Sequence, residues 1–188
     1  MNLVYPESYK KNNPKILSRI VRDMKENNNF HYLFVGNVGS GKSLLSRLIA
    51  NAYDKISNPF SKFHIIEARE VYYKYLNEIN SFRNVGPIIT GIEEYMASQR
   101  LIFDDIGNEK PGTDSAHEYI GTQIERRYDH IKNNPDKHTQ TIITTNLNNK
   151  EMWNLYGSRV VDRVQEVFTI MRFKPYSFRK EKREIIDG

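Results

Sequence analysis

The stretch that decides the fold is Gly36-Asn37-Val38-Gly39-Ser40-Gly41-Lys42-Ser43. It matches G-x-x-x-x-G-K-[ST], a phosphate-binding pattern, at every defined position. Glycines let backbone N–H groups curl around phosphate oxygens, and a following helix adds a positive dipole at the same point. Lys42 can reach the β- and γ-phosphates of a nucleotide, and the Ser43 hydroxyl can bind Mg²⁺. All eight residues are therefore predicted to bind ATP, with Ser43 also on the metal.

The flanks of this turn are those that the motif requires. Residues 31–35 form a short apolar run typical of a buried strand, and residues 43–53 carry apolar side chains at helical spacing. A glycine-rich turn with a chance lysine would not be expected between a strand and a helix. The context favours nucleotide binding over a merely structural turn.

The rest of the chain alternates between strand and helix patterns. We expect helices at residues 15–25, 70–79, 92–97 and 115–131, two helical turns around Gly157, and strands at 63–67, 100–105, 141–145 and 166–173. Such alternation indicates an α/β fold, with a parallel sheet covered by helices on both faces. Arg127, in the long helix, could face a subunit interface, but an arginine on a long exposed helix is usually solvated, and it is given no role.

Composition narrows the class of protein. A chain of 188 residues fits one domain, and its lack of cysteine excludes disulfides and fits a reducing, cytoplasmic setting. No apolar run approaches the length of a membrane span, so no membrane partner is expected. The formal charge of +5 is a mild excess. Six basic residues between positions 172 and 184 are more typical of a solvated terminus than of a nucleic-acid site.

Two carboxylates end the strand predicted at residues 100–105. Asp104 and Asp105 follow the apolar run Leu101-Ile102-Phe103. Beside a phosphate-binding turn, Asp104 is predicted to hold Mg²⁺ through water, and Asp105 to orient the attacking water as a general base. Two acids that merely end a strand are the alternative.

Thr144-Thr145-Asn146 ends the next strand and supplies a third element. A polar side chain there can hydrogen-bond the attacking water or the γ-phosphate, because neighbouring strand ends converge. The sequence resembles the AAA+ ATPases of the DnaC/IstB type, which include helicase loaders and transposition helpers. The segments that carry the resemblance, in this order along the chain, are 36–43, 101–107, 124–128, 141–147, 156–164 and 177–179. The resemblance implies a P-loop core with a five-stranded parallel sheet and little or no lid domain, preceded by a short helical extension at residues 1–30; the ATPase domain would span 31–188.

The resemblance also implies roles for particular residues. Asn146 would be the sensor-1 residue, and Arg159 an arginine finger that reaches the neighbouring subunit's ATP, with Arg163 as the alternative. Arg179, in Ser177-Phe178-Arg179, resembles a sensor-2 contact to the nucleotide made within the same chain. The implied partners are further copies of the chain, single-stranded DNA and a replicative helicase or another replication or transposition protein.

The first functional hypothesis is a Mg²⁺-dependent ATPase that acts in DNA replication as a helicase loader assembling on single-stranded DNA. A transposition helper shares the same core. A small-molecule P-loop kinase and a nucleotide-gated binding module with little turnover are the hypotheses from other classes. About 30 residues precede the first strand, room for one helix. A loader would therefore bind its partner through the helix at 15–25 or use an adaptor from another chain, unless it is a phage or mobile-element variant.

A contact with DNA could be made by the aromatic and basic cluster Tyr72, Tyr73, Lys74 and Tyr75, whose rings could stack on bases and whose lysine could bind phosphates. At least one or two of these aromatic rings must lie in the core, because successive helix positions do not share one face.

Overall fold

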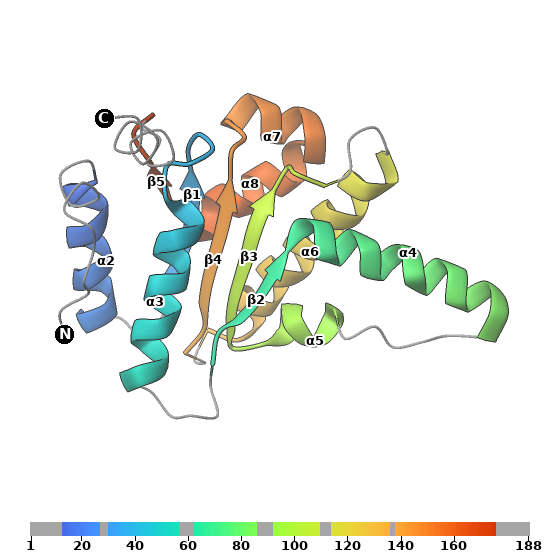
Figure 1. Ribbon diagram of the computed structural model, residues 1–188, viewed down its shortest axis with the longest axis horizontal. Coiled ribbons are helices and arrows are strands. Elements are labelled where there is room, and N and C mark those ends of the chain that lie inside the picture. Colours follow the sequence, from blue (N-terminus) through green and yellow to red (C-terminus); the bar gives the residue numbers. More distant parts are fainter. Residues whose placement is uncertain are drawn as a thin grey trace, which may run out of the picture.

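A five-stranded parallel sheet forms the centre of the protein (Figure 1). The computed structural model describes residues 13–26, 30–56, 62–85, 92–109, 114–135 and 138–175. The strands are β1 (Phe30–Val35), β2 (His64–Glu67), β3 (Arg100–Ile106), β4 (Gln140–Thr145) and β5 (Thr169–Arg172). Their order in the sheet is β2-β3-β4-β1-β5, so β1 lies between β4 and β5.

Helices connect the strands. They are α2 (Pro14–Glu26), α3 (Lys42–Ile56), α4 (Ala68–Val85), α5 (Ile92–Ala97), α6 (Asp114–Asn133), α7 (Asn149–Tyr156) and α8 (Ser158–Val167). Figure 1 shows α3 in front of the sheet, α6 and α8 behind it, and α7 beyond the carboxyl end of β4. No helix in these described ranges combines the length and apolar character needed to cross a membrane.

The two faces of the sheet pack into separate apolar clusters. In β1, Phe30, Tyr32 and Phe34 pack with α2 and α3, whereas Leu33 and Val35 pack with α4, α5, α6 and α8. Successive side chains of a strand point to opposite faces, so one apolar run serves both layers. Helices therefore cover both faces, as the alternation of elements predicts.

Helix α2 is fixed to the sheet by apolar and polar contacts. Leu17 and Ile20 are buried against β1 and α3. The Tyr32 hydroxyl on β1 donates to Asp23 Oδ2 at 2.9 Å, and the Nε of Arg19 donates to the same oxygen at 2.7 Å. Burial raises the pKa of the Tyr32 hydroxyl, so it stays protonated as a donor. The division of the chain at residue 30 stays a prediction.

One strand prediction was partly wrong. The alternating pattern at 166–173 predicts a strand throughout, but Glu166 and Val167 are the last residues of α8. Val160, Val161 and Val164 bury one face of that helix, and the Phe168 N–H donates to the Val164 carbonyl to close its last turn. Only Thr169–Arg172 then pairs with β1.

Arg127 lies in the core, so the expectation that it is solvated was wrong. Its residue exposure is 0%. Its guanidinium donates five hydrogen bonds, to the Thr141 hydroxyl and to the carbonyls of Met96, Ser98, Gln99 and Gln140. A guanidinium has five N–H donors, so each of them is used. Burial lowers the pKa of Arg127 to about 9, which leaves it charged at neutral pH.

This network predicts that Arg127→Met lowers the free energy of unfolding by about 3 kcal/mol or more, because four carbonyls lose a donor and a buried carbonyl left without any partner costs roughly 1–3 kcal/mol. The check is urea denaturation, with a lower midpoint and an unchanged slope. Arg126→Met is the matched control, since Arg126 is exposed and paired with Glu93 at 3.0 Å; its effect should stay within about 1 kcal/mol. Equal midpoints for the two variants would contradict the structural role of Arg127.

Candidate nucleotide-binding site

The turn between β1 and α3 has the backbone that its glycines allow. Gly41 has φ 90°, in the left-handed region that favours glycine, and α3 begins at the next residue. A Cβ at Gly36 would lie 2.8 Å from the Cβ of Phe173, so only glycine lets the turn approach the residue after β5. The first residues of α3, where helix N–H groups lack partners within the helix, line the hollow beside this turn.

Lys42 joins this turn to the end of β4. Its Nζ donates to the carbonyls of Gly36 and Asn37, at 2.6 and 3.0 Å, and to Asn146 Oδ1 at 2.7 Å. Lys42 is buried, with 5% residue exposure. The Lys42 ammonium now bonds these neutral acceptors. The charged oxygens of a bound phosphate would be stronger acceptors for it than these carbonyls.

Asp104 lies directly opposite the turn. Its Oδ1 accepts hydrogen bonds from the hydroxyls of Ser43, at 2.8 Å, and Thr144, at 2.5 Å. Asp104 is also buried, with 3% residue exposure. The serine and aspartate predicted to hold the metal therefore meet across the site.

Asp105 has an unusual backbone. Its φ is 61°, and the register between β3 and β4 shifts between Phe103 and Ile106. The Asp105 N–H donates to the Thr144 hydroxyl at 2.8 Å. A left-handed backbone costs most non-glycine residues about 1–2 kcal/mol, although Asp and Asn adopt it more readily than others. The bulge lets Asp105 share the same edge of the sheet as Asp104.

Two amides hold the Asp105 carboxylate. Asn146 Nδ2 donates to Oδ1 at 3.2 Å, and Asn108 Nδ2 donates to Oδ2 at 2.9 Å. Asn146 therefore bonds both Lys42 and Asp105, so the three sequence elements that predict the site converge on one side chain.

The residues suit Mg²⁺ bound together with a nucleotide. The Ser43 hydroxyl and the Asp104 carboxylate are hard oxygen ligands on neighbouring elements. In the described ranges no group of three His, Cys, Asp or Glu side chains could hold a metal ion. Mg²⁺ commonly binds through one or two protein oxygens and substrate phosphates, rather than in an all-protein cage.

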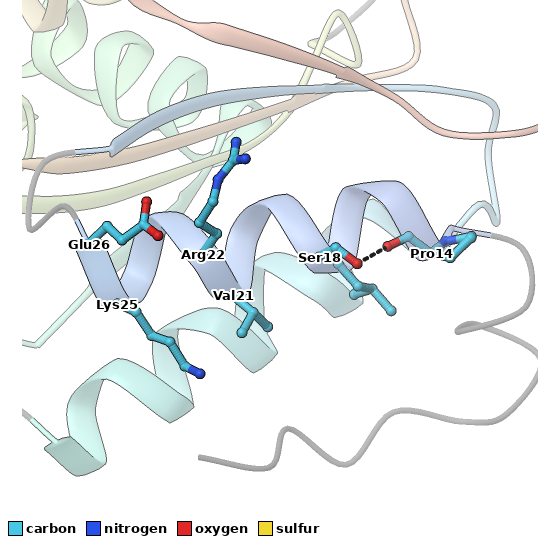
Figure 2. A pocket seen from close by; sticks show the side chains of 7 residues that line it. Pro14, Ser18, Val21, Arg22, Lys25 and Glu26 are labelled. Carbon is cyan, nitrogen blue, oxygen red and sulfur yellow. Dashed lines mark hydrogen bonds between the residues drawn. The ribbon is translucent and has the colours of Figure 1, made fainter.

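Two of the hollows in the described part of the chain are candidate binding sites. One of about 660 Å³ runs along α2 and is lined by Pro14, Leu17, Ser18, Val21, Arg22, Lys25 and Glu26 (Figure 2). All of these residues belong to one helix, and the bond drawn there, from the Ser18 hydroxyl to the Pro14 carbonyl, is internal to it. The other hollow, of about 460 Å³, is lined by the phosphate-binding turn together with Asp105, Asn108 and Asn146. Of these two hollows, the second brings together residues from several elements, including most of those predicted to bind the nucleotide.

The two arginines predicted as arginine fingers lie on α8, and both form ion pairs with Glu125 on α6. Arg159 Nε and Arg163 Nη1 approach the same oxygen, Glu125 Oε1, at 3.0 and 3.2 Å. The Arg159 side chain is 73% exposed, whereas that of Arg163 is 20% exposed and also lies over the Tyr128 ring. Arg159 is thus the more accessible of the two. Arg179 lies outside the described residues.

The aromatic cluster on α4 is divided between core and surface. Tyr72 is 3% exposed, and Tyr75 stacks on Tyr119 with centroids 4.2 Å apart. Lys74 lies over the Tyr95 ring, and Tyr73 is 51% exposed. Contact with DNA through this cluster stays a prediction, with Tyr73 as its exposed aromatic member.

Sequence reasoning missed three residues at the site. Thr144 lies within a recognised motif, but its hydroxyl bonds to both acids were not foreseen. Asn108 had no signal beyond its position three residues after Asp105. Arg47 contacts Asp104 Oδ2 at 3.6 Å; its spacing of four residues from Ser43 was the available clue.

Comparisons with known proteins support the fold. No known family model matches the sequence, and no curated protein matches it. Among solved structures, a DnaC helicase loader is similar over 90% of this chain and 100% of its own, with a TM-score of 0.67 and 19% identity. DnaI is similar over 90% of this chain and 95% of its own, with a TM-score of 0.64 and 14% identity.

A replication initiator DnaA bound to AMPPCP and single-stranded DNA is also similar, with a TM-score of 0.62 and 15% identity over 93% of this chain. This chain spans 52% of that DnaA chain. With identities below 20%, these similarities concern the fold. The chain has the fold of a P-loop ATPase domain of the AAA+ type, as in the DnaC helicase loader.

Proposed function

We propose that this chain binds ATP with Mg²⁺ at residues 36–43 and hydrolyses it. The observation that carries the proposal is the convergence of Lys42, Asp104, Asp105 and Asn146 through direct hydrogen bonds among the turn and the ends of β3 and β4. A complete phosphate-binding motif alone predicts binding. A carboxylate held beside it supports turnover as well.

Each group has a defined task in this proposal. Lys42 binds the β- and γ-phosphates, and Ser43 and Asp104 hold Mg²⁺. When bound, Mg²⁺ neutralises charge that develops on the phosphates. Asp105, oriented by its bonds to Asn146 and Asn108, accepts a proton from the attacking water. Asn146 can then position the attacking water or the γ-phosphate by hydrogen bonding.

We further propose that the chain assembles on single-stranded DNA and acts as a helicase loader in replication. The solved structures of similar fold support this, since they include two proteins of replication named DnaC helicase loader and replication initiator DnaA, the latter bound to single-stranded DNA. The exposed Arg159 supports assembly, because its guanidinium is available to a neighbouring copy. A transposition helper differs in its partner. Copurification with a replicative helicase supports the loader, and copurification with a transposase supports the helper.

Lys42→Ala should abolish MgATP binding, because it removes the cation that meets the phosphates. Titration with a fluorescent ATP analogue measures this, with Lys25→Ala on the exposed side of α2 as the matched control. Circular dichroism and urea denaturation of both variants separate lost binding from lost structure. Unchanged affinity in a folded Lys42→Ala protein would refute the site.

Asp105→Asn should keep ATP affinity while turnover falls by about 10²–10⁴-fold, the usual contribution of acid–base catalysis. Asparagine keeps the size of the side chain but cannot accept the proton. Steady-state phosphate release and analogue titration measure the two quantities. Asp104→Asn should instead weaken the dependence of binding on Mg²⁺. Full turnover in Asp105→Asn would move the base role to Asp104.

Arg159→Ala alone should lose turnover by about 10³-fold or more, as expected for a missing arginine finger. Mixing it with Lys42→Ala protein should restore part of that turnover, since the first variant keeps an intact pocket and the second still offers its arginine. Wild-type activity per molecule should also rise with protein concentration or with single-stranded DNA. Phosphate release from each protein and from the mixture provides the measurement.

Arg163→Ala is the comparison variant, because Arg163 is the less exposed partner of Glu125. It should keep most of its turnover. Loss of turnover in Arg163→Ala with normal turnover in Arg159→Ala would reverse the assignment. Full activity of both variants would remove the case for assembly through an arginine finger.

A further inference from the structure

Arg47, on α3, lies beside the proposed magnesium site and approaches two carboxylates with one nitrogen. Its Nη2 is 3.6 Å from Asp104 Oδ2 and 3.7 Å from Glu67 Oε1. The Asp104 side chain is 5% exposed, whereas those of Arg47 and Glu67 are 48% and 52% exposed. A buried carboxylate is therefore neutralised by a cation that remains half in solvent.

The local structure explains this arrangement. Ser43 and Arg47 are four residues apart and so lie on one side of α3. Ser43 donates to Oδ1 of Asp104, while Arg47 faces Oδ2. Glu67 at the end of β2 is the register partner of Asp104 on β3. One guanidinium is thereby set between two carboxylates that would otherwise repel each other.

We propose that Arg47 moves from Asp104 to Glu67 when Mg²⁺ binds with the nucleotide, and thereby sets the affinity for the metal. The inference rests on the proposed function, because it requires Mg²⁺ at Ser43 and Asp104. A guanidinium and a divalent cation repel each other at one carboxylate. Glu67 gives Arg47 a second partner, so the exchange leaves neither charge without a counterion.

Burial and exposure make the exchange possible. Asp104 is buried, and the hydroxyls of Ser43 and Thr144 both donate to its Oδ1, so Arg47 is the cation that faces its Oδ2. Arg47 is exposed enough that its ion pairs are weak and easily exchanged. Arg47 is therefore a positioning residue that competes with the metal, and Glu67 is the residue that draws it away.

The test measures binding rather than hydrolysis. The affinity for a fluorescent ATP analogue is titrated with excess EDTA and with saturating Mg²⁺, and the ratio gives the gain due to magnesium. Arg47→Gln should raise this gain by about two- to five-fold, in keeping with the small contribution of a half-exposed ion pair. Glu67→Gln should lower the gain by a similar factor, because Arg47 then has only Asp104. Arg126→Gln, at the contact of α5 with α6, changes the net charge equally and should leave the gain unchanged.

The double variant Arg47→Gln/Glu67→Gln separates exchange from a general charge effect. If Glu67 acts through Arg47, Glu67→Gln has no further effect once Arg47 is gone. If Glu67 attracts the metal directly, its effect persists in the double variant, and the proposal is overturned. An Arg47→Gln protein with unchanged gain, or with affinity lowered equally in EDTA and Mg²⁺, also overturns it. Absence of any MgATP binding by the wild-type chain would instead refute the proposed function itself.

Discussion

The Thr144 hydroxyl holds the site together, because it bonds to both acids of β3. It donates to the Asp104 carboxylate and accepts from the Asp105 N–H, at 2.5 and 2.8 Å. These two bonds, together with those that Asn146 and Asn108 donate to the Asp105 carboxylate, hold Asp105 in its left-handed backbone conformation. Because Thr144 lies in β4, next to β1, the same residue also sets the distance between the acids and the phosphate-binding turn. The arrangement of the two acids thus depends on one buried hydroxyl.

Much of the fold could be predicted, because strong local patterns dictate it. The helix at Ile92–Ala97 has the predicted bounds. Strand β1, before the phosphate-binding turn, begins one residue earlier than predicted and ends at the predicted residue. The segment 166–173 was misjudged because an alternating run also fits the last turn of an amphipathic helix. Only packing of Val160, Val161 and Val164 against neighbouring helices decides between the two periods. The order β2-β3-β4-β1-β5 likewise depends on contacts between distant segments.

A motif fixes both residue type and position for Lys42, Ser43, Asp104, Asp105 and Asn146, and the structure brings these side chains together as expected, while their roles stay predictions. The environments of the arginines were harder to predict from the sequence, because an arginine side chain can be a surface charge, an ion-pair partner or a hydrogen-bond donor in the core. Arg127 and Arg126 are neighbours on α6, yet the first is fully buried and the second exposed. Their environments differ because adjacent helix positions face about 100° apart. Of the two, only Arg127 points toward the backbone carbonyls at the end of α5, just before β3 and at the start of β4. No spacing in the sequence marks that difference.

Arg47 and Arg159 share a physical design that follows from the cost of unpaired charge. Arg47 has two carboxylates within 4 Å, and Glu125 has two guanidiniums. In the first case the cation can change partner, and in the second the anion keeps Arg163 if Arg159 turns to a neighbouring copy. Arg163 is suited to remain, since it is less exposed and lies over the Tyr128 ring. A half-exposed ion pair contributes about 0–1 kcal/mol, so either exchange is small beside the binding of a phosphate or a metal. In both places a charged group has two partners within 4 Å, so the loss of one contact leaves the other in place.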